Sequence, residues 1–224
     1  MQLLIRRYQP ADKDVVRSLF SVGILEHIGP CFRNAMSNPV HLSITLSLCV
    51  FSYLLGSVLT AVLAVLWVLA IYGCCHEIYA GFVRVKLHTD MQDICGNYLN
   101  RPDSCFWVAE AELYGKVQIL GMVAVVAKQN GKEKYGELFR MIISPQCRRT
   151  GLGLKMTQMV LDFSEQQGFS KVVLETSSTQ VAAIALYEKL GFEVVLTHTN
   201  TEGPVWMAWL SGVKVIRMEK KLGK

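Results

Sequence analysis

The residues most able to do chemistry form a basic, glycine-containing turn, Arg148-Arg149-Thr150-Gly151-Leu152-Gly153. An apolar run ending at Ile143 precedes it, and a stretch with helical periodicity over residues 151–167 follows. A strand that turns into a helix in this way points several backbone N–H groups at one spot beside the positive helix end. Glycine at positions 151 and 153 lets the backbone approach a phosphate closely. The turn therefore predicts an anion-binding site.

A second motif, Ala185-Leu186-Tyr187-Glu188-Lys189-Leu190-Gly191-Phe192, follows further along the chain. Alone, it is typical of an amphipathic helix that ends at a glycine. The turn lacks the Gly-Lys-Ser/Thr ending of a Walker loop, and the chain contains no GxGxxG dinucleotide fingerprint. The turn and this helix, with a predicted strand over residues 171–176 between them, form a specific combination.

This combination resembles the GCN5-related N-acetyltransferase (GNAT) superfamily, through Arg148-x-x-Gly151-x-Gly153 and residues 186–192. Residues 5–12 are similar to that superfamily's first strand and turn, so the resemblance covers nearly the whole chain outside one apolar segment. Residues 87–94 and 104–110 look like the camello-like branch. That branch includes membrane-bound cysteine-S-conjugate N-acetyltransferases, related lysine acetyltransferases and the brain aspartate N-acetyltransferase.

The resemblance implies acetyl-CoA as the cosubstrate. The turn would hold its pyrophosphate, and the preceding strand would pair with its pantetheine arm and polarise the thioester carbonyl with one N–H group. Tyr187 would donate a proton to the departing CoA thiolate after direct attack by a neutral amine. The residues implied to bind the cofactor are Met141, Ile142, Ile143, Arg148, Arg149, Thr150, Gly151, Leu152 and Gly153.

The acceptor side is less sharply defined by the sequence. Glu137 matches the catalytic glutamate of histone-type members and is our first candidate for the general base; Glu110 and Glu112 are alternatives. Arg140 would meet an anionic substrate group, and Glu110 is a second candidate contact for the acceptor. Gln180 stands where many members of the superfamily have an asparagine that contacts the cofactor.

The pattern of elements predicts an α+β GNAT fold, in which helices flank a central mixed, mostly antiparallel sheet, with an inserted membrane hairpin. The expected strands are residues 3–8, 105–110, 118–127, 137–144, 171–176, 194–199 and 213–218. The expected helices outside the apolar segment are residues 14–26, 88–99, 151–167 and 180–190.

The apolar segment is the second unusual feature of the chain, because residues 34–76 contain no Asp, Glu, Lys or Arg. Its apolar core, residues 42–75, would span about 50 Å as one helix, whereas a bilayer's hydrocarbon core is about 30 Å thick. Two short helices with a turn near Gly56-Ser57 fit better. We therefore expect residues 1–33 to open the acetyltransferase domain, 34–76 to be the membrane insertion, and 77–224 to complete the domain.

The implied fold constrains the topology, because the first strand precedes the insertion and the other strands follow it. Both flanks must then lie on one side of the membrane. Basic residues on these flanks favour the cytosol, and the resemblance suggests the endoplasmic reticulum. These basic residues are Arg17, Arg33, Arg84 and Lys86. The alternative is a lumenal active site, because some camello-like members are described as lumenal acetyltransferases.

Charge and cysteine spacing bear on the remaining partners. The formal net charge is +5 without a basic run, which disfavours nucleic acid. No cysteine and histidine spacing suits zinc, so no metal is expected. The expected partners are membrane lipid and either a small-molecule amine or a lysine side chain. Cysteine S-conjugates are the first hypothesis for the acceptor; the alternatives are protein lysine acetylation and a catalytically idle, CoA-binding membrane protein.

Overall fold

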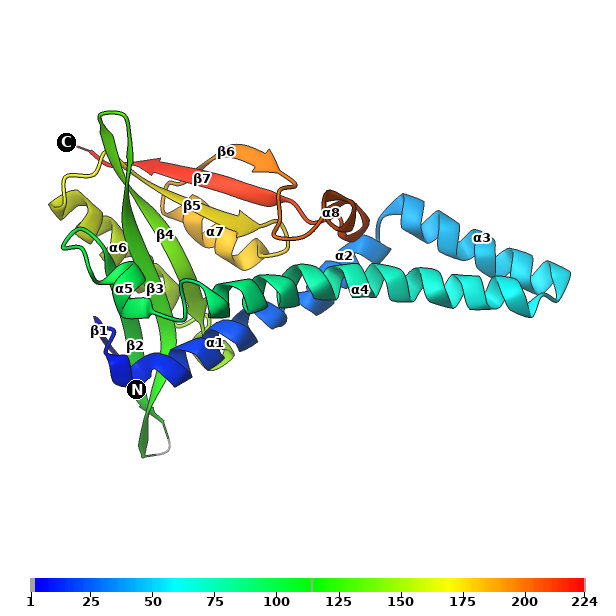
Figure 1. Ribbon diagram of the computed structural model, residues 1–224, viewed down its shortest axis with the longest axis horizontal. Helices are drawn as coiled ribbons and strands as arrows, with labels where there is room; N and C mark the ends of the chain where they lie inside the picture. Colours follow the sequence, from blue (N-terminus) through cyan, green and yellow to red (C-terminus); the bar gives the residue numbers. More distant parts are fainter. Residues whose placement is uncertain (1–2, 114, 224) are drawn as a thin grey trace.

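A seven-stranded sheet organises the protein, and the computed structural model describes residues 3–113 and 115–223 (Figure 1). The strand order is β1-β2-β3-β4-β5-β7-β6. Only the β4–β5 pair is parallel. The strands are β1 (Leu3–Arg7), β2 (Cys105–Leu113), β3 (Lys116–Asn130), β4 (Glu133–Ile143), β5 (Lys171–Ser177), β6 (Glu193–His198) and β7 (Val215–Lys221). The mixed, mostly antiparallel sheet predicted from the sequence is confirmed.

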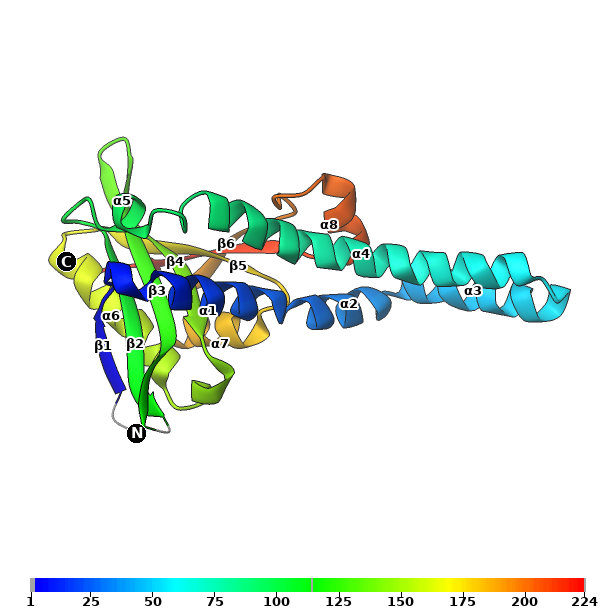
Figure 2. The ribbon, with the colours of Figure 1, turned by 60° about the horizontal axis from the view of Figure 1, so that its bottom comes forward.

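Helices cover both faces of this sheet (Figure 2). Two single 3₁₀ turns, Pro10–Asp12 and Pro145–Cys147, follow β1 and β4. The helices are α1 (Lys13–Leu25), α2 (Ile28–Met36), α3 (Pro39–Leu55), α4 (Val58–His88), α5 (Ile94–Tyr98), α6 (Leu152–Gln166), α7 (Val181–Lys189) and α8 (Val205–Ser211).

Each face of the sheet carries its own apolar core. Phe20 of α1 and Val83 of α4 belong to one buried cluster, together with Met122 of β3. Met156 of α6 and Tyr187 of α7 belong to the other. Alternation of side chains along the strands assigns each residue to one of the two cores, so the sheet separates two different environments.

The sheet opens between β4 and β5. These strands pair only where Gly136–Leu138 lie beside Val172–Leu174, and beyond this point they diverge. The register between β3 and β4 shifts between Met122 and Ala124, which marks a β-bulge at Arg140 and Met141 of β4. Arg140 has φ 55°, which is unusual for a residue other than glycine. Bulge and divergence together leave one edge of β4 without a partner strand.

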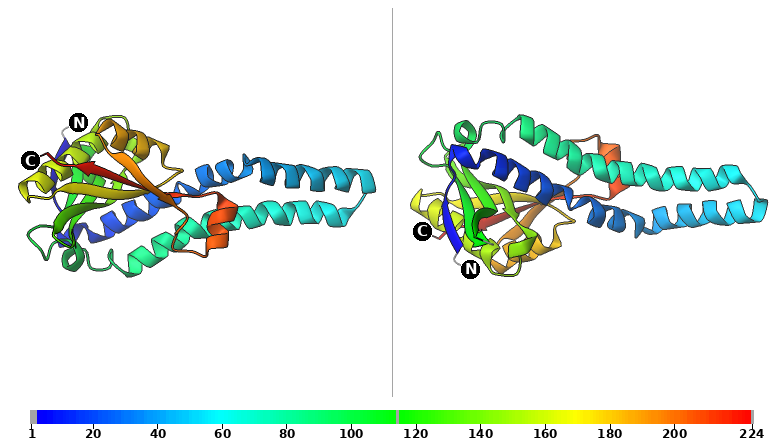
Figure 3. Two further views of the ribbon diagram at one scale, coloured as in Figure 1. Left: turned by 90° about the horizontal axis from the view of Figure 1, so that it is seen from above. Right: turned by 90° about the horizontal axis from the view of Figure 1, so that it is seen from below.

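The apolar segment forms a helical hairpin that projects away from the sheet (Figure 3). The Asn38 side chain accepts a 2.9 Å bond from the N–H of Val40 and starts α3, and Gly56 (φ 58°) makes the turn. By length and composition, Pro10–Met36 and Val58–His88 are long and apolar enough to cross a membrane, and α3 is a shorter apolar helix. The apolar face of α1 is buried in the core, so the hairpin of α3 and α4 is the better candidate.

The helix expected over residues 88–99 is wrong. Instead, α4 runs on from the hairpin to His88, and only Ile94–Tyr98 is helical after it. The C-terminal part of α4 buries Tyr79 and Val83 in the domain core. Because one helix runs without a break from the apolar hairpin into the core, the hairpin is continuous with the domain that contains the sheet.

A partly buried cluster of ions joins β1 to the start of α1. The Arg6 guanidinium contacts the Asp12 carboxylate at 2.7 Å and the Glu110 carboxylate at 2.7 Å. Asp12 also accepts a 2.8 Å bond from the N–H of Gln9. The hydrogen bond from Arg6 outweighs burial and lowers the pKa of Asp12.

Replacing Asp12 with asparagine is expected to reduce the free energy of unfolding by about 1.5–3 kcal/mol at neutral pH, the usual contribution of hydrogen bonds to a charged group. Because the folded-state pKa of Asp12 is depressed, its stabilisation is present above the unfolded pKa of about 3.9 and is lost as pH falls below it. Denaturant unfolding of detergent-solubilised protein at several pH values checks this, with exposed Asp162→Asn as the control. A difference between Asp12→Asn and the natural chain that does not shrink as the pH is lowered from 7 to 3 would contradict it.

Candidate active site

The predicted phosphate turn contains two residues with a left-handed backbone conformation, one on either side of Thr150. Arg149 has φ 62° and Gly151 has φ 82°, and Gly151 is the N-cap of α6. A Cβ on Gly151 would meet no atom within 4 Å, whereas one on Gly153 would lie 3.1 Å from Cδ2 of Leu186. The two glycines therefore act differently: Gly151 supplies the backbone conformation, and Gly153 allows α6 to pack closely against α7.

Arg148, which we expected to contact the pyrophosphate, turns back toward the sheet. Its Nε lies 3.3 Å from the carbonyl oxygen of Ile143, and its guanidinium pairs with Glu26, just beyond α1. Arg149 is exposed. Thr150 closes the turn with a 2.7 Å bond from its hydroxyl to the carbonyl of Cys147, and Leu152 is buried. The anion-facing groups of this turn are therefore the backbone N–H groups at the start of α6.

The backbone of Met141, Ile142 and Ile143 lines the gap beside β5. Ser144 donates its N–H to Leu120 of β3 at 2.8 Å. Because successive amides of a regular strand point to opposite edges, Ile143 directs its backbone groups into the gap and Ile142 directs its own toward β3, whereas Met141 lies at the bulge. Consistent with this, the Ile143 carbonyl meets Arg148 rather than a strand. The N–H of Met141, at the bulge next to the gap, stays the predicted donor to a thioester carbonyl.

Tyr187, a residue of α7, is buried in the apolar core that α6 and α7 share. Its ring packs against Phe192 with centroids 5.6 Å apart, and its side chain is buried. Burial raises the pKa of Tyr187 well above its ordinary value, so the hydroxyl stays protonated at neutral pH. The preceding residue, Leu186, contacts the phosphate turn at Gly153. Tyr187 is therefore a protonated acid held close to the predicted cofactor site.

Glu137 lies on the other face of the sheet, because its neighbour Leu138 belongs to the core under α6. The carboxylate is 3.9 Å from the Lys128 ammonium. Burial, the largest influence, raises the pKa of Glu137; Lys128 lowers it and Glu175 raises it further. A carboxylate with a raised pKa suits a general base. The candidate acid and the candidate base thus lie on opposite faces of the sheet.

Arg140 has a carboxylate partner within the protein. Its Nε and Nη2 lie 2.8 Å and 2.7 Å from Oδ2 of Asp90, and Tyr98 also donates to that carboxylate. The guanidinium sits over three phenylalanine rings, among them Phe20 at 5.3 Å. This charge pair anchors the bulge of β4 to the segment after α4. A contact between Arg140 and a substrate anion stays a prediction, and a substrate anion would have to compete with Asp90.

The other acceptor-side candidates are spread over the fold. Glu110 is paired with Arg6 in the ion cluster at the start of α1, and Glu112 is exposed. Gln180 is the N-cap residue of α7, and its Oε1 accepts a 2.5 Å bond from the Thr176 hydroxyl. Gln180 thereby closes the turn between β5 and α7; a cofactor contact from it stays a prediction.

One polar contact at the mouth of the gap was not anticipated. The Tyr79 hydroxyl of α4 lies 2.9 Å from Oγ of Ser177 and 2.5 Å from Oγ1 of Thr179. It ties the helix from the apolar hairpin to the end of β5. In the sequence Tyr79 is simply one more aromatic residue after an apolar run, so no local signal pointed to it.

Comparison with known proteins gives the class first. Residues 71–192 match the Acetyltransferase (GNAT) family. The fold is shared with an acetyltransferase of the GNAT family from Staphylococcus aureus Mu50, at a TM-score of 0.57 and 16% identity over 99% of this chain and 100% of that one.

Proteins with higher sequence identity to this chain then identify the branch of the GNAT family. N-acetyltransferase family 8 member 3 of Mus musculus is 41% identical over 199 residues, 84% of each chain. The Xenopus laevis protein named "Probable N-acetyltransferase camello" is 35% identical over 198 residues, 84% of this chain and 85% of that protein. The chain therefore belongs to the GNAT acetyltransferases, in the branch of the family 8 and camello N-acetyltransferases. The predicted family, fold and class of enzyme are confirmed.

Proposed function

We propose that this protein transfers the acetyl group of acetyl-CoA to the amino group of a small amino-acid derivative, with cysteine S-conjugates as the first candidates. The observation that carries the proposal is the unpaired edge of β4, which ends in a glycine turn at the start of α6. An extended pantetheine arm can add to such an edge as a strand would. The turn then lies where the pyrophosphate would be.

The residues around the gap suit a direct transfer. The amine nitrogen attacks the thioester carbon, and the Met141 N–H stabilises the oxygen that becomes negative, a contribution of about 2.7–4 kcal/mol in such sites. Glu137 takes the proton that the nitrogen loses. As the C–S bond breaks, Tyr187 gives its proton to the sulfur, so the products are the amide and free CoA. Holding both reactants in one gap supplies much of the acceleration.

A membrane anchor supports a partly lipophilic acceptor. Large apolar side chains of α3 and α4 are exposed, among them Tyr53 at 88% and Val58 at 77%. At 17 residues, α3 is about 26 Å long, close to the thickness of a bilayer's hydrocarbon core. We infer that the hairpin crosses the membrane twice, that residues 34–76 are the inserted segment, and that the domain formed by 1–33 and 77–224 faces the cytosol at the endoplasmic reticulum.

The acceptor class is tested by offering benzyl-cysteine, aspartate and a lysine peptide side by side with labelled acetyl-CoA. Purified protein in detergent is used, with Gly151→Asp as the inactive control. Label on benzyl-cysteine alone supports the proposal. Label on the peptide alone would establish the alternative, a protein-lysine acetyltransferase. No transfer to any acceptor while acetyl-CoA still binds would favour the idle, CoA-binding alternative.

A Glu137→Gln variant is expected to lose up to about 100-fold in kcat/KM at neutral pH. This is the lower end of the range for general acid–base catalysis, because the amine can also lose its proton to water. In the natural enzyme, activity should fall as pH drops through the raised pKa of Glu137, since a protonated carboxyl accepts no proton. The variant should lack this step and keep only the titration of the amine itself.

The comparison variant is Glu175→Gln, which removes the same charge from the neighbouring strand; it should keep the step but move it to lower pH, because Glu175 raises the pKa of Glu137. Glu175 is more exposed than Glu137 and pairs with Arg217 at 3.5 Å. Initial rates from pH 5 to 9 compare the two variants. Equal pH profiles for Glu137→Gln and the natural enzyme would remove Glu137 from the mechanism and turn attention to Glu110 and Glu112.

A further inference from the structure

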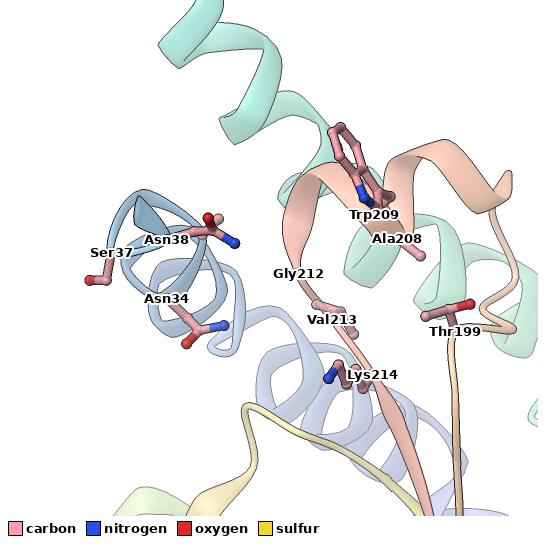
Figure 4. Close-up of a pocket in the computed structure, with 10 residues that line it drawn as sticks. Asn34, Ser37, Asn38, Thr199, Ala208, Trp209, Gly212, Val213 and Lys214 are labelled. Carbon is pink, nitrogen blue, oxygen red and sulfur yellow. The ribbon is translucent and has the colours of Figure 1, made fainter. Parts of the chain in front are cut away.

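A pocket of about 430 Å³ lies where α2 meets α3, facing α8 and the start of β7 (Figure 4). Asn34 and Asn38 line one side, and Thr199, Trp209 and Lys214 line the other. None of these residues is one of the predicted cofactor-binding, catalytic or substrate residues, although Thr199 and Trp209 lie in the 198–209 segment, where such folds carry an acceptor loop. The pocket therefore calls for an explanation separate from the acetyl transfer.

The polar groups of the pocket favour an anion. Lys214 is exposed and is the one charged residue in the lining, so no carboxylate there neutralises it. Figure 4 shows the Lys214 ammonium and the Asn34 amide extending toward each other from opposite sides. The Asn38 oxygen is engaged by the N–H of Val40, which leaves the NH₂ of that amide as a donor. An ammonium group surrounded by amide and hydroxyl groups can bind a phosphate or a carboxylate.

The position of the pocket indicates where the anion comes from. Asn38 is the residue at which the apolar hairpin begins. On the other side, α8 exposes Trp206 at 55% and Trp209 at 69%. Tryptophan gathers at membrane–water interfaces, so α8 and the root of the hairpin both fit the level of the lipid headgroups. Val40, two residues after Asn38 in the first turn of α3, is an apolar side chain that is 55% exposed.

We propose that this pocket binds the phosphate of an anionic phospholipid from the surrounding bilayer. The headgroup phosphate meets Lys214, Asn34 and Asn38, and the acyl chains run along Trp209 and Val40. A free phosphate ion would use the polar groups alone and leave this apolar border uncovered. The inference rests on the membrane anchor in the proposed function and adds to it the class of lipid.

Native mass spectrometry of the full chain in detergent, with equal amounts of phosphatidylglycerol and phosphatidylcholine, tests the proposal. The natural protein should retain phosphatidylglycerol about fivefold better, the factor that one basic residue supplies at a charged membrane surface. Lys214→Gln should bind the two lipids equally. The matched control is Lys132→Gln, in the exposed turn between β3 and β4, which should behave like the natural chain.

Two further arms separate the possible outcomes. Inorganic phosphate should not displace the phosphatidylglycerol; if it does, the pocket is a site for soluble anions and the inference is overturned. Vesicle flotation and acetyl-CoA binding are measured on the same samples. No lipid preference in protein that floats with vesicles would overturn this inference alone. Protein that binds acetyl-CoA but does not float would overturn the membrane anchor and this inference with it.

Discussion

A Gly151→Asp variant is expected to bind acetyl-CoA at least about 100-fold more weakly than the natural protein. Gly151 has φ 82°, and open space surrounds the place of its missing Cβ, so the chain itself can accept a side chain there. Aspartate tolerates left-handed backbone better than most residues and is a favoured N-cap. Its carboxylate would nevertheless stand where the pyrophosphate approaches. Losing two charge-assisted hydrogen bonds, at about 1.5–3 kcal/mol each, accounts for this loss of affinity.

Gly168→Asp is the matched control for this variant. Gly168 ends α6 with φ 70°, and a Cβ there also meets nothing within 4 Å. The two variants share the same backbone strain and the same change of charge, but only Gly151 lies at the N-terminus of α6. Equilibrium binding of acetyl-CoA, together with thermal unfolding, compares them. Equal affinities for the two variants would show that the turn before α6 does not hold the pyrophosphate.

A Tyr187→Phe enzyme is expected to lose about 10²–10⁴ in kcat, the usual contribution of a general acid, with little change in KM for acetyl-CoA. The substitution removes one oxygen and keeps the ring that packs against Phe192. Burial holds the hydroxyl protonated, so the loss should extend across the whole neutral range of pH. Initial-rate kinetics between pH 6 and 9 measure the effect.

Changing the acyl donor tests whether Tyr187 acts by proton donation. A thioester whose thiol is more acidic than that of CoA needs less help in leaving, so Tyr187→Phe should lose less activity with it. Tyr8→Phe serves as the control, because Tyr8 is another buried tyrosine, with a pKa raised to about 12, packed against Phe106 far from the phosphate turn in the sequence. An equal loss with both donors would assign Tyr187 to packing rather than to proton transfer.

Much of this protein could be predicted from the sequence because its signals are local. The left-handed backbone at Gly151, the glycine at the end of α7 and the charge-free segment over 34–76 each depend on a few adjacent residues. The predicted turn near Gly56 is found there, with the left-handed φ that favours glycine. Local signals of this kind identified the family, the fold and the apolar hairpin.

Other features were missed because their causes are distant along the chain. The short helix α8 has no clear periodic signal over its seven residues, and it packs against the side of α4. The extension of α4 to His88 was also missed. The local sequence does not specify a helix there, and burial of Tyr79 and Val83 against the domain stabilises it.

The sequence by itself determined which groups are available: a glycine turn, a tyrosine, a few carboxylates and an apolar hairpin. Only the tertiary structure decided what those groups face. The sequence suggested that the Arg140 guanidinium would bind an anionic substrate. In the structure this guanidinium instead pairs with the carboxylate of Asp90, 50 residues away in the chain. Arg148 turns to Glu26, and the gap itself exists because β4 and β5 diverge after three paired residues. Charge partners and strand divergence depend on contacts between distant segments, and residue spacing does not encode them.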